Sequence, residues 1–212
     1  MTTVARISRH FRHRRMRWFC SAMGITASTR ILDVGGSPDT WMGLPFPPCV
    51  TLVNIPMSIT SYSPGLPWVA GDGCSLPFRD GAFDIVFSNS VIEHVGNWQR
   101  QLAFARETMR VGKRYFVQTP NRAFPIEQHL FLPLVHWLPR RWQRAVVWRF
   151  TPWEWITRPR TDQREFYLRH FLEDVRLLGA SDLRQLFPGA RVHRERLFGI
   201  AKSLVAMLPP GA

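Results

Sequence analysis

Short apolar runs rich in branched side chains recur through the first 120 residues, and each is typical of a buried β-strand. They cover residues 30–34, 50–55, 68–70, 83–88 and 114–118. Between the last two runs, apolar residues from Val91 to Met109 recur at steps of four and three, which predicts a helix that ends near Gly112. Because strands alternate with a helix, the pattern predicts an α/β domain with a mostly parallel sheet, whose ligands bind beyond the carboxyl ends of the strands.

Three further segments complete the predicted organisation of residues 1–212 as one domain. Residues 1–23 form a basic N-terminal segment, with a helix predicted over residues 4–23. Residues 121–171 are rich in tryptophan, arginine and proline, and we interpret them as an inserted cap or substrate-binding segment. A short helix capped by Ser181 and strands near 192–197 and 203–207 are predicted after it.

The charge and cysteine content restrict the class of protein. Lys and Arg number 28 against 15 Asp and Glu, and the net charge of +13 attracts nucleic acid, anionic lipid or phosphorylated molecules. Genomic base composition, which can enrich arginine, explains the charge equally well. The three cysteines form no CxxC pair and have no histidine at metal-ligand spacing, so we expect a reducing compartment and no metal. No apolar run reaches the roughly 18 residues of a spanning helix, so we expect a cytoplasmic protein, either soluble or peripheral at a membrane.

Candidate chemistry follows the predicted strand ends. The first strand runs into Gly35 and Gly36, whose small size lets backbone N–H groups approach a ligand. The third strand leads to Asp72, which could accept a hydrogen bond from an adenine amino group. The fourth ends at the polar Asn89. A Gly-Gly turn alone is weak evidence, but the three strand ends together are specific.

The segment from Arg30 to Asn121 resembles the class I S-adenosylmethionine-dependent methyltransferases, in particular the ubiquinone/menaquinone-biosynthesis-type (type 11) group. The family's hallmarks are a strand close to ILDVGCGTG, a GDA-LPF segment and FD-V-S-VLEHV, and here they read ILDVGGSPD, GDGCSLPF and FDIVFSNSVIEHV. The resemblance implies a Rossmann-like fold with helices on both faces of a seven-stranded sheet, whose last strand is antiparallel. It also implies S-adenosylmethionine as the cofactor.

The resemblance also implies a set of cofactor-binding residues. The first-strand loop would hold the methionine part, the second strand end the ribose, the third the adenine, and the fourth would lie beside the sulfonium. In that order these residues are Asp33, Gly35, Gly36 and Ser37; Asn54; Asp72, Gly73 and Cys74; and Asn89. The chain departs from the family where Ser37 and Asp39 replace glycines and where Asn54 replaces an acidic residue, which binds a hydroxyl more strongly.

Two histidines are candidate catalytic residues on the acceptor side. His94 follows the fourth strand, and His129 follows the fifth, with Glu127 placed to orient it. An ordinary structural role is the alternative for both. We interpret Glu93 as half of a capping box with Ser90. Methyl transfer often needs only proximity and alignment, so a reaction without a base stays open.

The sequence therefore predicts methyl transfer to a small-molecule, glycan or lipid-like acceptor. The tryptophans of residues 130–156 either line a substrate pocket or meet an anionic membrane, and both interpretations stay open. RNA methylation is an alternative, but residues 88–91 lack the Pro-Pro-aromatic segment of the amino-directed nucleic-acid enzymes. A degenerate, methyltransferase-like membrane or partner adaptor is a third interpretation.

Overall fold

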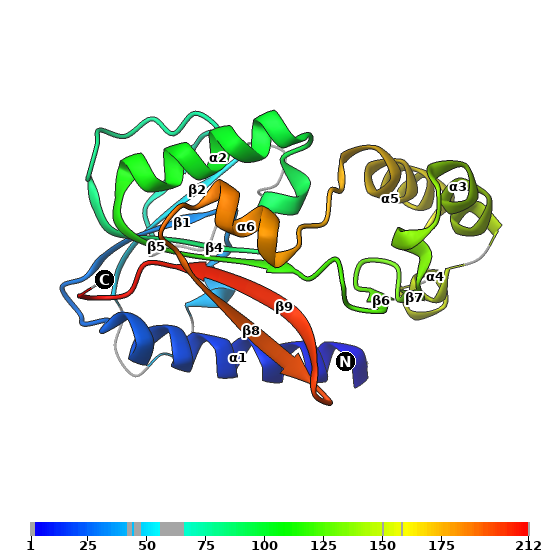
Figure 1. The fold of residues 1–212 in the computed structure, drawn as a ribbon, viewed down its shortest axis with the longest axis horizontal. Coiled ribbons are helices and arrows are strands. Elements are labelled where there is room, and N and C mark those ends of the chain that lie inside the picture. Colours follow the sequence, from blue (N-terminus) through cyan, green and yellow to red (C-terminus); the bar gives the residue numbers. More distant parts are fainter. Residues whose placement is uncertain are drawn as a thin grey trace.

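A computed structural model describes residues 3–41, 44, 48–55, 66–149, 151–157 and 159–211, with side chains from residue 13 onward. Seven strands form one twisted sheet in the order β3-β2-β1-β4-β5-β9-β8 (Figure 1). Their bounds are β1 Arg30–Val34, β2 Cys49–Asn54, β3 Trp68–Ala70, β4 Phe83–Asn89, β5 Gly112–Pro120, β8 Arg191–Leu197 and β9 Ile200–Met207. Strand β9 runs antiparallel to β5 and to β8, whereas β1 to β5 pair in parallel. The predicted sheet, including its antiparallel last strand, is confirmed.

Helices cover both faces of the sheet. Helix α1 (Thr3–Met23) lies along one face, and α2 (Trp98–Val111) and α6 (Ala180–Leu186) lie on the other (Figure 1). Successive side chains of a strand point to opposite faces. In β4, Phe87 packs with Phe19 of α1, while Val86 packs in the cluster that contains Phe104 of α2. Because both faces of the central strands are buried, β1 and β4 are mostly apolar, as the sequence pattern predicted. The edge strand β8 is mostly exposed and carries charged side chains.

A separate helical unit follows β5. It contains β6 (Ile126–Glu127), β7 (Leu132–Pro133), η4 (Val135–Trp137), α3 (Arg140–Arg149), α4 (Pro152–Thr157) and α5 (Thr161–Asp174). Figure 1 shows it beyond the end of β5. It has its own apolar core, which includes Leu130, Val147 and Phe171. We call residues 121–174 the cap.

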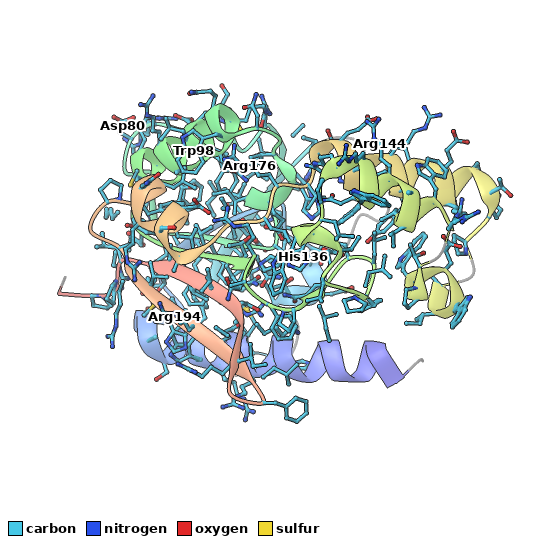
Figure 2. The ribbon with its side chains drawn as sticks, turned by 45° about the vertical axis from the view of Figure 1, so that its right-hand side comes forward. Asp80, Trp98, His136, Arg144, Arg176 and Arg194 are labelled. Carbon is cyan, nitrogen blue, oxygen red and sulfur yellow. The ribbon has the colours of Figure 1, made fainter. Side chains whose placement is uncertain are left out.

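The chain returns from the cap across α2. The Arg176 guanidinium lies 5.2 Å from the centre of the Trp98 ring, and Figure 2 shows the two side chains together. The buried Gln101 amide donates to the carbonyl oxygens of Ile92 (3.2 Å) and Arg176 (3.0 Å). These contacts fix the cap against the sheet domain.

Most of the tryptophans of the cap are at its surface. Trp137, Trp142 and Trp155 are 53%, 55% and 71% exposed, while Trp153 stacks on Tyr167 with ring centres 4.1 Å apart. Pocket lining therefore does not account for the three exposed rings. Within the described residues, no helix has the length and hydropathy that a membrane span requires.

Three local predictions need correction. The segment after β4 forms a short 3-10 helix, η3 (Ile92–His94), and α2 begins only at Trp98, because the Asn97 side chain accepts a hydrogen bond from Arg100 N. The Ser90–Glu93 capping box is wrong, since η3 begins after Val91 without a side-chain cap and the Ser90 hydroxyl donates to Gln118 instead. Helix α6 is not capped by Ser181 either. It starts after Gly179, whose N–H donates to the Asp182 carboxylate at 2.7 Å.

Candidate functional site

A cleft of about 580 Å³ opens at the carboxyl ends of β1 to β4. This volume lies in the range of small-molecule and cofactor sites. The lining comes from consecutive strand ends, from η3, and from two side chains on α2 and α5. It consists of Val34 to Ser37, Val53 to Ile55, Gly71 to Gly73, Ser90, Val91, His94, Val95, Arg100 and His170. Six of the nine predicted cofactor residues, namely Gly35, Gly36, Ser37, Asn54, Asp72 and Gly73, line this cleft.

The loop after β1 requires glycine at positions 35 and 36, but not at positions 37 and 39. Gly35 has φ +75°, and a Cβ on it would lie 2.5 Å from Val91 Cγ2. A Cβ on Gly36 would lie 1.8 Å from Asp33 Oδ2. Ser37 has φ −131° and ψ 155°, an extended conformation that any residue adopts, and Asp39 lies in the 3-10 turn η1 (Pro38–Thr40). The two replaced glycines therefore leave the loop unstrained.

Asp33 lies beneath this loop rather than in the lining of the cleft. Its side chain is fully buried, and Oδ2 accepts a hydrogen bond from Trp41 Nε1 at 2.8 Å. Its other oxygen has no hydrogen-bond partner among the described residues. Burial raises the pKa of Asp33 to about 7, although the Trp41 hydrogen bond opposes the shift.

Asn54 and Asp72 stand at neighbouring strand ends. Asn54 Oδ1 accepts from Ile55 N at 2.9 Å, and Asn54 Nδ2 donates to the Gly36 carbonyl at 3.4 Å. Asp72 accepts from Cys74 N at 2.9 Å and from Arg100 at 2.7 Å. Burial of Asp72 opposes ionisation, but these two donors hold its pKa below the ordinary value.

The other two predicted cofactor residues lie outside the lining. The Cys74 thiol donates to the Arg100 carbonyl at 3.3 Å, and burial with the Asp72 charge raises its pKa to about 11. The Asn89 side chain accepts from Arg15 of α1, which also pairs with Glu195 of β8 at 2.6 Å. Their cofactor contacts stay predictions.

Three histidines meet where the cap joins the cleft. His94 Nε2 lies 3.1 Å from His129 Nε2, and His94 Nδ1 lies 3.3 Å from His170 Nε2. A carboxylate holds each outer ring, since His129 Nδ1 is 2.6 Å from Glu127 Oε1 and His170 Nδ1 is 2.7 Å from Asp174 Oδ2. The structure thus brings both predicted catalytic histidines together and adds His170. His170 lies four residues before Asp174 on α5, a helical spacing from which the sequence could have predicted their pairing. The same spacing does not indicate that His170 contacts His94.

Burial controls ionisation in this cluster. Burial and the neighbouring charges of His129 and His170 lower the pKa of His94 to about 3. Burial also opposes a charge on His129, but its contact with Glu127 raises the pKa above the ordinary value. Glu93 accepts from the Thr119 hydroxyl at 3.0 Å, and burial raises its pKa to about 7. The His94 imidazole, which borders the cleft, is therefore neutral at physiological pH.

Comparisons with known proteins agree with this arrangement. A family model described as "Methyltransferase domain" matches residues 54–115. No curated protein sequence matches the chain. Among solved structures, the PH0226 protein from Pyrococcus horikoshii OT3 is similar with a TM-score of 0.59 and 16% identity, covering 96% of this chain and 91% of that one.

Two further structures share the fold. A methyltransferase in complex with the Haloferax volcanii Trm112 methyltransferase activator has a TM-score of 0.57 and 12% identity, with 94% of this chain and 89% of that one covered. The magnesium protoporphyrin IX methyltransferase from Synechocystis PCC 6803, with bound SAH, has a TM-score of 0.54 and 11% identity, with 93% and 81% covered. At such identities these likenesses establish the fold alone.

The strand order and the cleft at the strand ends define the fold of the class I methyltransferases. The match over residues 54–115 agrees with this fold and supports a methyltransferase that uses S-adenosylmethionine and is similar to the type 11 group.

Proposed function

We propose that this chain transfers a methyl group to a small-molecule, glycan or lipid-like acceptor that binds between the cleft and the cap. One observation carries the proposal. The cleft that begins at the glycine loop also borders His94 and His170, so it joins the predicted cofactor site to the histidine cluster. In-line displacement requires the acceptor atom and the transferred group to lie within contact distance in one enclosed space.

The residues present fit S-adenosylmethionine. The close approach of Gly36 to Asp33 leaves no room for a side chain, and it exposes loop backbone to the cleft. Asn54 and Asp72 offer a side-chain amide and a carboxylate for ribose hydroxyls and the adenine amino group. When bound, the cofactor supplies an electrophilic methyl group on a sulfonium. Asp33 supports the loop from below and has a positioning role.

His94 and His129 are the proposed acceptor-side residues. His94 borders the cleft with 28% of its side chain exposed, while His129 stands behind it with 15% exposed. His94 is neutral and therefore borders the acceptor space without repelling the cationic cofactor. The Tyr167 hydroxyl donates to the His129 carbonyl at 3.1 Å and ties this arrangement to α5.

The acceptor class rests on the character of the cap. Trp142 and Trp155 are exposed, and arginines surround them in the sequence, a combination suited to the headgroup region of a membrane or to a sugar face. We therefore favour a lipid-like or glycan acceptor at the surface of a membrane. A second hollow, of about 400 Å³, lies between α1 and β8 and is lined by Arg14, Arg194 and other basic residues. It offers a further contact for anionic groups.

A labelling assay tests the proposed function. The protein is incubated with cell extract and methyl-labelled S-adenosylmethionine, and the extract is then separated into lipid, RNA, protein and small-molecule fractions. We expect label in the lipid or small-molecule fraction, and much less with the Asp72→Ala variant. Label confined to RNA would instead support the nucleic-acid alternative. Absence of label from all fractions, despite measurable cofactor binding, would support the adaptor interpretation.

A further inference from the structure

Glu93, His94 and His129 place their ligand atoms around one point. One nitrogen of each imidazole and one carboxylate oxygen lie within 4.8 Å of one another. The two Nε2 atoms are 3.1 Å apart, and Glu93 Oε1 lies 4.0 Å from His94 Nε2. In a tetrahedral zinc site the ligand atoms lie about 3.3 Å apart, given zinc–nitrogen bonds of about 2.0 Å. The pair of imidazoles already has about this spacing, whereas the carboxylate oxygen must move by up to about 1.5 Å to reach it.

The hydrogen bonds of the cluster fix where the ring protons lie. Glu127 Oε2 accepts from two backbone N–H groups, at 2.9 Å from His129 and 2.7 Å from Leu130, and these bonds orient the buried side chain toward the His129 ring. Its Oε1 therefore receives the proton of His129 Nδ1 at 2.6 Å. The neutral His129 ring consequently carries its lone pair on Nε2.

The same reasoning applies to the other side of the cluster. His170 Nδ1 donates to Asp174 at 2.7 Å, so its Nε2 accepts from His94 Nδ1 at 3.3 Å when the ring is neutral. This leaves the lone pair of His94 on Nε2. With all three rings neutral, two lone pairs face each other across 3.1 Å with no proton between them. Such an arrangement requires a proton or a metal ion between the two nitrogens.

A proton would satisfy the two imidazoles but would leave the carboxylate unpaired. Glu93 is fully buried, its Oε2 accepts from Thr119, and its Oε1 has no hydrogen-bond partner among the described residues. A buried carboxylate oxygen without a partner is costly. A divalent ion accepts two neutral nitrogens and one carboxylate oxygen together, which leaves none of the three lone pairs unmatched.

We propose that Glu93, His94 and His129 bind a divalent transition-metal ion of the Zn²⁺ type. The outer partners fit this assignment, because metal-binding histidines usually donate their other N–H to a carboxylate or a similar acceptor. Glu127 serves His129 directly, and Asp174 serves His94 through His170. Three protein ligands leave one position of a tetrahedral ion open, and His94 borders the cleft. The ion would therefore bind and polarise an acceptor oxygen, nitrogen or sulfur atom.

The role of the ion in catalysis rests on the proposed function, but its binding does not. The first experiment therefore measures binding alone, on the full chain without an affinity tag and after removal of metal by a chelator. Titration with Co²⁺ should give one equivalent with the visible absorption of a tetrahedral ion, and Zn²⁺ should displace it. Failure of the metal-free protein to bind Co²⁺ or Zn²⁺ at 100-fold molar excess would overturn the proposal.

Substitutions then assign the ligands. His129→Asn should lower Zn²⁺ affinity at least 100-fold, and Glu93→Gln at least 10-fold. Glu127→Gln should lower it about 10- to 100-fold, because an outer partner is lost. The control is His193→Asn, since His193 lies on β8 against Trp18 and outside the cluster. The Zn²⁺ affinity of this variant should differ from that of the parent less than twofold. Unchanged Zn²⁺ affinity in His129→Asn would show that the ion binds elsewhere.

Two further measurements keep the test decisive if a variant misfolds. X-ray absorption of the zinc-loaded parent protein should show two imidazoles in the coordination shell, whereas sulfur ligands would contradict the assignment. Labelling with metal-free protein separates the two proposals. Undiminished methyl transfer without metal would overturn the role of the ion and keep the proposed function. Tight Zn²⁺ binding at this cluster without any methyl transfer would keep the metal site and contradict the proposed function.

Discussion

The buried carboxylate of Asp33 makes the stability of the protein depend on pH in a calculable way. Burial raises its pKa from an ordinary value of 3.8 to about 7 in the folded protein. Between these two pH values the unfolded chain has lost the proton while the folded protein retains it, so stability falls as pH rises. At about 1.4 kcal/mol per pH unit, the total loss is about 4 kcal/mol, and above pH 7 the contribution is constant.

The Asp33→Asn variant removes this titration. Asparagine still provides an acceptor for Trp41 Nε1, whereas its amino group lies where Oδ1 has no partner, at a pH-independent cost of about 1–3 kcal/mol. The informative quantity is therefore the change with pH. We expect the free energy of unfolding of the variant, minus that of the parent, to increase by about 2.5 kcal/mol between pH 5 and pH 8.

Urea unfolding of both proteins at several pH values in this range measures the difference. Asp80→Asn is the matched control, because Asp80 is 82% exposed and its substitution should leave the pH profile parallel to that of the parent. If the Asp33→Asn profile is also parallel to the parent's, the carboxylate does not titrate as burial requires, and the reasoning is refuted.

Three further outcomes follow from the same structure. Gly36→Ala should lower the free energy of unfolding by about 1–3 kcal/mol in denaturant melts, since its Cβ would overlap a buried carboxylate 1.8 Å away. Asp72→Ala should weaken S-adenosylmethionine binding about tenfold by calorimetry, because a half-exposed charged acceptor is lost, while Asp80→Ala should bind normally. Replacing Trp142 and Trp155 together by alanine should reduce flotation with anionic vesicles several-fold without changing the melting temperature, and unchanged flotation would count against a membrane surface on the cap.

The sequence predicted which residues line the cleft at the sheet edge, because these residues stand at strand ends. Gly35, Asn54 and Asp72 each follow an apolar run directly, and parallel strands bring such positions to one edge of the sheet. The burial of Asp33 could not be predicted in this way. It depends on Trp41, whose indole reaches back from beyond η1.

The acceptor half was predicted only in part. His94 and His129 were identified, but their contact was not, because 35 residues and the whole of α2 and β5 separate them in sequence. A metal site was not expected, since metal-ligand motifs are recognised by close spacing and this cluster has none. Glu93 was instead assigned to a capping box, on the basis of sequence spacing alone. Its neighbour Ser90 has the right spacing, but Ser90 has φ +57° and donates instead to the Gln118 side chain.

The two halves of the site depend on different parts of the fold for their geometry. Hydrogen bonds between parallel strands hold the cofactor residues in register, so that half is as rigid as the sheet. The distance from His94 to His129 instead depends on how the cap packs on η3. The Gln101 amide joins Ile92 to Arg176, and Arg176 N donates to the Glu93 carbonyl at 2.8 Å. If the acceptor binds as proposed, changes at this buried junction should alter acceptor binding while the lining at the strand ends stays the same.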